Sequence, residues 1–122
     1  MDIAYICIFA SHLEESVLFY RDILGLVEDL SRSDENFRAL RAGSTYIGIE
    51  RKGVRKDGEK TKAENPILIQ FKASSLQELQ EITKDLEAKN VTMLKTMVTG
   101  SYGTFTNFLD PDGNKLEILY QP

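Results

Sequence analysis

The feature that most constrains the fold of this chain is an internal repeat, in which Ser11 recurs as Ser74, 63 positions later. At the same spacing three apolar positions match, namely Ile6 with Ile69, Ala10 with Ala73, and Leu13 with Leu76. Each serine is followed three residues later by an acid or an amide, Glu14 or Gln77, a pattern typical of a capping box at the start of a helix. A half of roughly 60 residues buries little of its own surface. We therefore expect the two halves to share one core.

Both halves predict the same order of elements, strand–helix–strand–strand–strand. In the first half the apolar run 3–9 predicts a strand, and a helix with one apolar face follows and ends at Gly25. Further strands are expected over residues 26–30, 37–41 and 45–50. In the second half strands are expected over residues 67–72, 91–98, 102–109 and 115–120. Its helix has a predicted buried face of Leu76, Leu79, Ile82 and Leu86 and ends at Asn90.

A charged stretch, Arg51–Glu64, separates the halves and shows no hydrophobic periodicity. Its excess of basic over acidic residues allows a phosphate-binding patch, but a solvated connecting loop is the simpler interpretation. We therefore predict a single α+β domain of two βαβββ modules that form an open, curled mixed sheet. Module 1 spans about 1–52, a linker spans 53–65, and module 2 spans about 66–122.

Composition excludes several classes of partner. The chain carries 15 basic and 19 acidic residues, a net charge of −4, which disfavours nucleic acid as a partner. No apolar run approaches the roughly 18 residues of a membrane span. The single cysteine, Cys7, cannot form an internal disulfide, and no signal peptide is evident at the N-terminus. These observations predict a cytoplasmic protein.

Period-two alternation in the strands sorts the side chains into two faces. One face is apolar and is expected to pack under the helices. The other face mixes aromatic and polar side chains: Tyr5, Cys7, Gln70, Phe105, Asn107 and Glu117, joined by Tyr46, Glu50 and, beside Gln70, Leu68. Aromatic walls with a few polar groups are typical of a small-molecule cleft. A solvent-exposed or dimer-buried sheet face is the alternative.

Two segments resemble the signatures of a known family. Residues Phe19–Leu26, FYRDILGL, resemble the helix-to-strand signature of the glyoxalase/bleomycin-resistance superfamily, also called vicinal oxygen chelate proteins. Residues Asp110–Glu117, DPDGNKLE, resemble its C-terminal signature. The resemblance covers essentially the whole chain and implies paired βαβββ modules that curl around a cleft, usually as a homodimer. It does not fix an activity, because one scaffold carries lyases, epimerases, dioxygenases and drug-sequestering binders.

The metal ligands of the metal-dependent members of this family are mostly missing. The resemblance implies a ligand in the first strand of each module, one in the last strand, and a fourth in mid-strand. Carried onto this sequence, these positions hold Tyr5, Leu68, Glu117 and Gly48. Leucine and glycine offer no ligand atom and neutral tyrosine is a poor one, whereas a catalytic zinc needs about three protein ligands. His12, the only histidine, is expected on the first helical turn, away from the cleft. We therefore expect no cofactor and no divalent metal.

The sequence thus predicts a metal-free small-molecule-binding protein, which sequesters a drug or metabolite in a dimer cleft. In this interpretation Tyr5, Tyr46 and Phe105 provide stacking surface, and Glu117 selects a positive or hydrogen-donating group. Alternatively, Glu117 acts as an acid or base, or pairs with Lys115 or Lys72. The alternative function is a glyoxalase I-like (lactoylglutathione lyase-like) lyase or isomerase with a rearranged metal site, for example around Cys7, Glu50 and Glu117. A structural or regulatory dimer with a vestigial cleft is a third interpretation.

Overall fold

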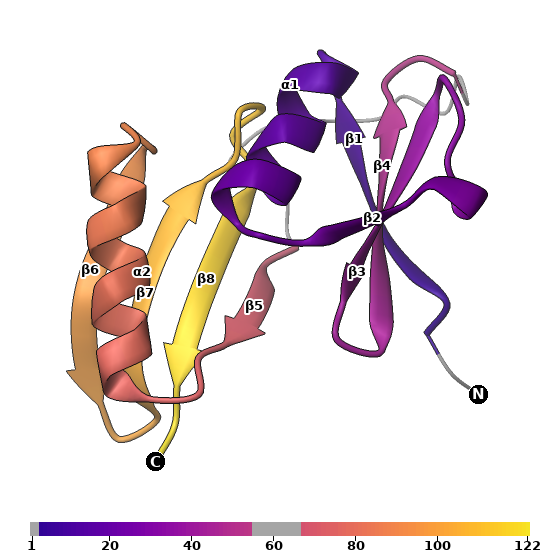
Figure 1. The fold of residues 1–122 in the computed structure, drawn as a ribbon. Helices are drawn as coiled ribbons and strands as arrows, with labels where there is room; N and C mark the ends of the chain where they lie inside the picture. Colours follow the sequence, from indigo (N-terminus) through magenta and orange to yellow (C-terminus); the bar gives the residue numbers. More distant parts are fainter. Residues whose placement is uncertain (1–2, 55–66) are drawn as a thin grey trace. The chain divides into compact units, whose positions relative to one another are not determined.

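A computed structural model of the chain describes residues 3–54 and 67–122 (Figure 1). The chain divides into two units, unit 1 (Met1–Thr61) and unit 2 (Lys62–Pro122). Their boundary lies inside the segment that the sequence predicts as a linker. Of that linker only residues 53 and 54 are described, and residues 55–65 lie outside the described part. No helix in the described ranges is long and apolar enough to cross a membrane.

Unit 1 contains a four-stranded mixed sheet with a helical segment between its first two strands. In chain order its elements are β1 (Tyr5–Ala10), α1 (Leu13–Leu18), a π-helical stretch η1 (Phe19–Ile23), β2 (Val27–Asp29), a 3₁₀ turn η2 (Leu30–Arg32), β3 (Phe37–Ala42) and β4 (Thr45–Arg51). The strand order is β1-β4-β3-β2. Strand β1 runs parallel to β4, whereas the other pairs are antiparallel. Parallel neighbours need a long connection, which here consists of the helical segment, β2, η2 and β3.

Unit 2 repeats the same arrangement. Its elements are β5 (Ile69–Lys72), α2 (Leu76–Ala88), β6 (Met93–Gly100), β7 (Gly103–Leu109) and β8 (Lys115–Tyr120). The strand order is β5-β8-β7-β6, with β5 parallel to β8 and the other pairs antiparallel. Each unit is therefore one βαβββ module, and the predicted α+β fold class is confirmed. The strands begin or end within two residues of the predicted bounds.

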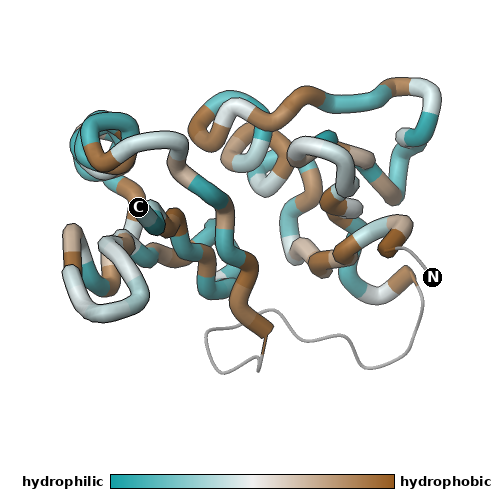
Figure 2. Tube along the Cα trace, turned by 90° about the horizontal axis from the view of Figure 1, so that it is seen from below, coloured by the Kyte–Doolittle hydropathy of each residue, from teal (hydrophilic) through white to brown (hydrophobic). Residues whose placement is uncertain are grey.

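Each unit buries its own apolar stripe between helix and sheet. In unit 1 the fully buried side chains include Leu13, Val17 and Tyr20 from the helical segment and Ile47 and Ile49 from β4. In unit 2 they come from α2 and from the facing strands β7 and β8: Leu79, Leu86, Phe108 and Leu116. Figure 2 shows hydrophobic and hydrophilic residues interleaved along the chain in both units, as alternation and helical periodicity require.

The predicted helix starts need correction. Helix α1 has His12 as its N-cap, without a side-chain capping hydrogen bond. The carboxylate of Glu14 instead accepts a hydrogen bond from Arg38 Nη1 at 2.8 Å. In α2 the capping box is shifted by one residue: Ser75 Oγ accepts from the Glu78 N–H at 3.0 Å, and Glu78 Oε1 accepts from the Ser74 N–H at 3.0 Å. An ionised glutamate is a stronger acceptor than the amide of a glutamine, which favours this register.

The predicted buried face of α2 is wrong at its first residue. Leu76 is 42% exposed, and the buried residues of the helix are Leu79, Thr83 and Leu86. The Thr83 hydroxyl is satisfied by the Leu79 carbonyl and by Thr106 Oγ1, both at 2.8 Å. These hydrogen bonds offset the cost of taking the hydroxyl out of water, so a polar residue is tolerated on the buried face of α2. The helix end at Asn90, with φ of 60°, is as predicted.

Candidate functional site

The candidate site lies on the face of the unit 2 sheet opposite α2. The turn after β7 fixes the register of this face, because the Asp110 carboxylate accepts hydrogen bonds from the backbone N–H groups of Asp112 at 3.0 Å and of Asn114 at 2.8 Å. The antiparallel pairing that follows places Asn107 opposite Glu117. The parallel pairing of β5 with β8 places Gln70 on the other side of Glu117. Three predicted site residues therefore form one row across three strands.

Glu117 is the centre of this row. Its side chain is nearly buried, with the residue 7% exposed. Oε1 accepts from Gln70 Nε2 at 2.7 Å, and Oε2 accepts from Asn107 Nδ2 at 3.4 Å. Within the described ranges Glu117 has no ion pair, so the predicted alternative of a partner at Lys72 or Lys115 is replaced by two neutral amides. These amides orient the carboxyl group and bring no positive charge to it.

The orientation of Asn107 is itself fixed by the backbone. Strand β6 bulges opposite this residue, and the Lys95 N–H donates to Asn107 Oδ1 at 2.9 Å. Because the carbonyl oxygen of the side chain accepts this bond, its NH₂ group points to Glu117. The same bulge is held from the helix face of the sheet, where the Met97 N–H donates to Thr106 Oγ1 at 3.1 Å. Asn107 therefore supports Glu117.

An open pocket of about 400 Å³ adjoins Glu117. It is lined by Gln70, Tyr102, Phe105, Glu117, Leu119 and Gln121. The rings of Tyr102 and Phe105 lie 5.6 Å apart, centre to centre. A neighbouring pocket of about 200 Å³ shares Gln70, Leu119 and Gln121 and adds Phe71 and Lys72. The lining of the larger pocket thus combines apolar and aromatic surface with a single carboxyl group.

Three lining residues were not predicted as site residues. Leu119 and Gln121 follow Glu117 at steps of two, so alternation assigns them to the same face of the sheet as Glu117. Tyr102 is the first residue of a predicted strand, and alternation assigns it to the face opposite Phe105, but in the structure it lies in the turn before β7. Its ring packs over Gly100, where an added Cβ would lie 2.6 Å from the ring. Its carbonyl accepts a hydrogen bond from Gln121 Nε2 at 3.0 Å, which ties this turn to the end of β8.

The predicted residues of unit 1 form a second group on the face of their sheet opposite α1. The register places Tyr5 beside Tyr46 and Cys7 beside Gly48. The Tyr5 ring lies 5.5 Å from the Tyr46 ring and 5.6 Å, edge to face, from Phe37. Cys7 is exposed rather than a small buried side chain, and Glu50 is 9% exposed.

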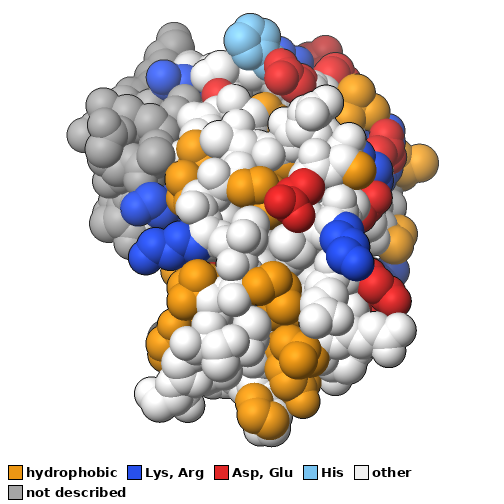
Figure 3. All heavy atoms as spheres, turned by 90° about the vertical axis from the view of Figure 1, so that its left-hand side faces the viewer, with side chains coloured by type: hydrophobic (Ala, Val, Ile, Leu, Met, Phe, Trp, Pro, Cys, Tyr) orange, Lys and Arg blue, Asp and Glu red, His pale blue; other side chains and the backbone are white. Residues whose placement is uncertain are grey.

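The two remaining candidates are exposed side chains. Leu68 precedes β5 and is 43% exposed. His12 is exposed, as expected for the N-terminus of α1; in Figure 3 the pale blue side chain of the only histidine stands at the surface.

The residues at the four metal positions do not fit a metal. An added Cβ at Gly48 would lie 2.6 Å from the Phe37 ring, so this ring fills the space of a ligand side chain. The Tyr5 hydroxyl accepts a hydrogen bond from Arg32 Nη1 at 2.9 Å. Leu68 has no donor atom, and Glu117 is engaged by two amides. No group of three or more His, Cys, Asp or Glu suited to a metal occurs in the described part of the chain.

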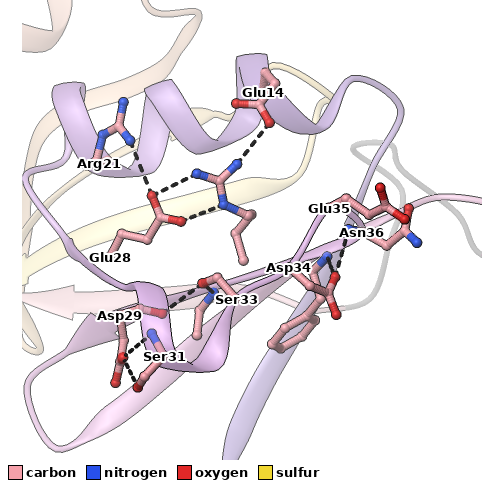
Figure 4. Close-up of polar contacts among 12 residues, drawn as sticks. Glu14, Arg21, Glu28, Asp29, Ser31, Ser33, Asp34, Glu35 and Asn36 are labelled. Carbon is pink, nitrogen blue, oxygen red and sulfur yellow. Dashed lines mark hydrogen bonds and ion pairs between the residues drawn. The ribbon is translucent and has the colours of Figure 1, made fainter.

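A separate polar network ties the helical segment of unit 1 to its sheet (Figure 4). Glu28 accepts hydrogen bonds from Arg38 through Nε and Nη2 and from Arg21 Nη1, while Arg38 Nη1 also bonds Glu14. The Arg38 guanidinium holds the pKa of the Glu28 carboxyl below its usual value and its own pKa is raised in turn. This network lies on the helix side of the sheet and serves the fold rather than the candidate site.

The sequence model of the glyoxalase/bleomycin resistance protein/dioxygenase superfamily matches residues 2–118. The chain belongs to this superfamily. Solved structures agree with it in fold: a family enzyme from Burkholderia phytofirmans PsJN is 21% identical, with a TM-score of 0.84 and 98% of each chain covered. A glyoxalase-related enzyme from Fulvimarina pelagi is 18% identical, with a TM-score of 0.83, 99% of this chain and 88% of that chain covered.

A lactoylglutathione lyase from Agrobacterium tumefaciens is also similar to this superfamily member, at 20% identity and a TM-score of 0.75, over 98% of this chain and 92% of that chain. None of the curated proteins matches the chain. Identities at this level establish the fold and leave the activity to the chemistry of the residues present.

Proposed function

We propose that this superfamily member is a metal-free small-molecule-binding protein whose ligand presents a positively charged, hydrogen-donating group to Glu117. The observation that carries the proposal is the environment of the Glu117 carboxylate, namely its burial, its hydrogen bonds and the residues around it. It is 7% exposed, is held by two neutral amides, and lines a pocket whose other lining residues include no cation. A buried carboxylate without a countercharge is costly, and a cationic ligand relieves that cost.

The rest of the pocket supports a ligand with an apolar body. Phe105, Tyr102 and Leu119 supply apolar and aromatic surface on one side of the carboxylate. A volume of about 400 Å³ lies within the range of small-molecule sites. Charge-assisted hydrogen bonds to Glu117 would fix the orientation of such a ligand, and the aromatic rings would contribute most of the contact area.

The second candidate function is a lyase or isomerase of the glyoxalase I type with a rearranged metal site. It is favoured by Glu117, the one family ligand position that this chain retains, and by the similarity in fold to a lactoylglutathione lyase. The residues at the other three positions, Tyr5, Gly48 and Leu68, count against it. Binding without metal therefore remains the better-supported proposal.

We also propose a homodimer in the cytoplasm as the working form. Tyr102 and Leu68 are 47% and 43% exposed, and a second copy would cover apolar surface of this kind. Sedimentation at micromolar concentration tests the assembly. A single species with the mass of one chain would contradict the dimer and would leave the proposal for Glu117 standing.

The test of the ligand proposal is a thermal-shift screen of matched pairs of cationic and neutral aromatic compounds, with and without divalent metal ions. We expect cationic compounds to raise the melting temperature without metal, because binding to the native state raises apparent stability. For the best compound, Glu117→Gln should weaken binding about tenfold to 150-fold, equivalent to about 1.5–3 kcal/mol. Glu87→Gln on the exposed surface of α2 removes the same charge and should leave affinity unchanged.

Two results would contradict this proposal. One is an unchanged affinity in Glu117→Gln together with a folded variant, which would mean that the carboxylate does not contact the ligand. The other is stabilisation only in the presence of a divalent metal, which would favour the lyase or isomerase instead.

A further inference from the structure

The aromatic face of unit 1 already holds a cation, the side chain of Arg32. Its guanidinium carbon lies 4.5 Å from the centre of the Tyr46 ring, above the ring face. Its Nη1 donates to the Tyr5 hydroxyl at 2.9 Å, and its Nε lies 3.3 Å from Asp29 Oδ2. One planar cation thus receives a ring face, a hydroxyl acceptor and a carboxylate.

We infer that Tyr5, Tyr46 and Asp29 form a binding site for a planar guanidinium-type cation, and that Arg32 fills this site until a ligand cation displaces it. Each contact matches the chemistry of that group. The face of a tyrosine attracts a cation through its quadrupole, the planar fork donates along its edges, and the carboxylate supplies the opposite charge. This site lies in unit 1, so the inference is independent of the Glu117 pocket in unit 2.

The three residues that form this site, Tyr5, Tyr46 and Asp29, are held in place by contacts that do not involve Arg32. Tyr5 and Tyr46 come from neighbouring strands in direct register, and Phe37 packs edge to face on Tyr5. Asp29 is held by the Ser31 N–H at 3.0 Å and the Ser31 hydroxyl at 2.6 Å, as Figure 4 shows. The Tyr46 hydroxyl donates to the same carboxylate at 3.3 Å. A site that is preorganised in this way does not need to reorder when its occupant changes.

The occupant, in contrast, is weakly held. The Arg32 side chain is 48% exposed and lies at the end of the three-residue turn η2. Its ion pair with Asp29 joins residues three apart in the sequence, and exposed pairs of this kind contribute little free energy. A ligand that displaces Arg32 forgoes these contacts, so Arg32 competes with any ligand for the site. The apparent affinity of the chain for a cation is the intrinsic affinity of the site multiplied by the fraction of time that Arg32 is out of it.

The test compares the Arg32→Ala variant with the wild-type chain, using methylguanidinium as the probe. The tyrosine ring resonances report on binding in NMR spectra, with Tyr5→Phe and Tyr46→Phe variants used for assignment. We expect saturable shifts of the Tyr5 and Tyr46 rings in Arg32→Ala, with an apparent affinity about tenfold or more above that of the wild type. Methylammonium, which lacks the planar fork, should bind more weakly.

Arg41→Ala is the matched control variant. Arg41 lies opposite Tyr46 in the pairing of β3 with β4, is exposed, and carries the same charge. Its removal should leave the probe affinity at the wild-type value. Adding Asp29→Asn to Arg32→Ala should abolish the gain. If Arg32→Ala does not fold, Arg32→Gln provides the same comparison.

Three results would overturn the inference. The first is the absence of saturable shifts in a folded Arg32→Ala or Arg32→Gln variant. The second is an equal gain in Arg41→Ala, which would reveal a general charge effect. The third is an equal response to methylammonium and methylguanidinium, which would show that the site does not select a planar cation.

Discussion

Replacement of Arg38 by methionine is the sharpest test of how unit 1 is held together. Met keeps most of the aliphatic volume of the side chain and removes the guanidinium. Glu28 then loses its two hydrogen bonds from Arg38 and keeps only the contact from Arg21 Nη1 at 3.2 Å. Its carboxylate stays buried, since the Glu28 side chain is only 5% exposed.

The expected loss in the free energy of unfolding is about 3 kcal/mol. Removing one partner of a buried ion pair costs about 3–5 kcal/mol, and two features place this case at the lower end. Arg21 remains as a second partner, and the Arg38 side chain is itself 17% exposed. The lost contact with Glu14 adds little, because that side chain is 75% exposed. For a chain of this size the melting temperature should fall by about 10 °C.

The same pair predicts a pH dependence. Arg38 lowers the pKa of Glu28 below 4.5 in the folded state, so the unfolded chain binds more protons at acidic pH. The stabilisation from this pair is therefore fully present above pH 4.5 and is lost as the pH falls through the folded-state pKa. In Arg38→Met the folded-state pKa of Glu28 is expected to rise. The difference in stability between wild type and variant should shrink below pH 4.5.

Urea unfolding followed by circular dichroism, at neutral pH and across the acidic range, measures both effects. Arg38→Met combined with Glu28→Gln should recover about half of the loss, because no unpaired charge remains buried. A loss below about 1 kcal/mol at neutral pH would place this pair with exposed ion pairs and refute the argument. A difference in stability that does not change with pH would refute the role of Glu28.

Further predictions concern the backbone, the helix cap and the metal. Gly103→Ala should lower the free energy of unfolding by about 3 kcal/mol or more in thermal unfolding, since φ is +125° and an added Cβ would overlap the Tyr120 carbonyl oxygen. An effect below about 1 kcal/mol would contradict this geometry. Gly48→Ala should lower the free energy of unfolding by about 1–3 kcal/mol, because the added Cβ overlaps the Phe37 ring. Adding Phe37→Leu should recover part of this loss, because the smaller side chain relieves the overlap. Ser75→Ala should cost about 1 kcal/mol through loss of the α2 cap, and an unchanged denaturation midpoint would argue against that cap. Elemental analysis of the purified protein should find less than about 0.1 equivalent of Zn, Ni, Mn or Fe, whereas stoichiometric metal after mild chelation would favour the lyase or isomerase.

The sequence by itself determined the module and its duplication. The repeat between Ser11 and Ser74, together with the periods of two and 3.6, gave the order of elements in both units. Alternation in the predicted strands 102–109 and 115–120 placed Asn107 and Glu117 on one face. These features depend on local backbone geometry, which a single segment of sequence encodes.

Local patterns were less reliable at the helix starts, where more than one hydrogen-bond partner was available. The sequence predicted a capping box at Glu14, but the carboxylate bonds Arg38, which is 24 residues away. At α2 both Gln77 and Glu78 could complete a capping box, and in the structure Glu78 does so, with Ser75 as the N-cap. A propensity rule ranks the residues that could cap a helix, but it contains no information on which residues from distant parts of the chain lie nearby.

Only the tertiary structure decided which side chains meet on the two faces. Alternation placed Gln70, Asn107 and Glu117 on one face, but the pairing of three strands made them a single hydrogen-bonded row. In unit 1 the sequence predicted an aromatic wall at Tyr5 and Tyr46. In the structure the Arg32 side chain packs against these two tyrosines. Alternation assigns a residue to a face, whereas its neighbours there depend on which distant strands pair and in which register. Those pairings are set by the packing of the whole unit, and the identity of each site residue's partner follows from them.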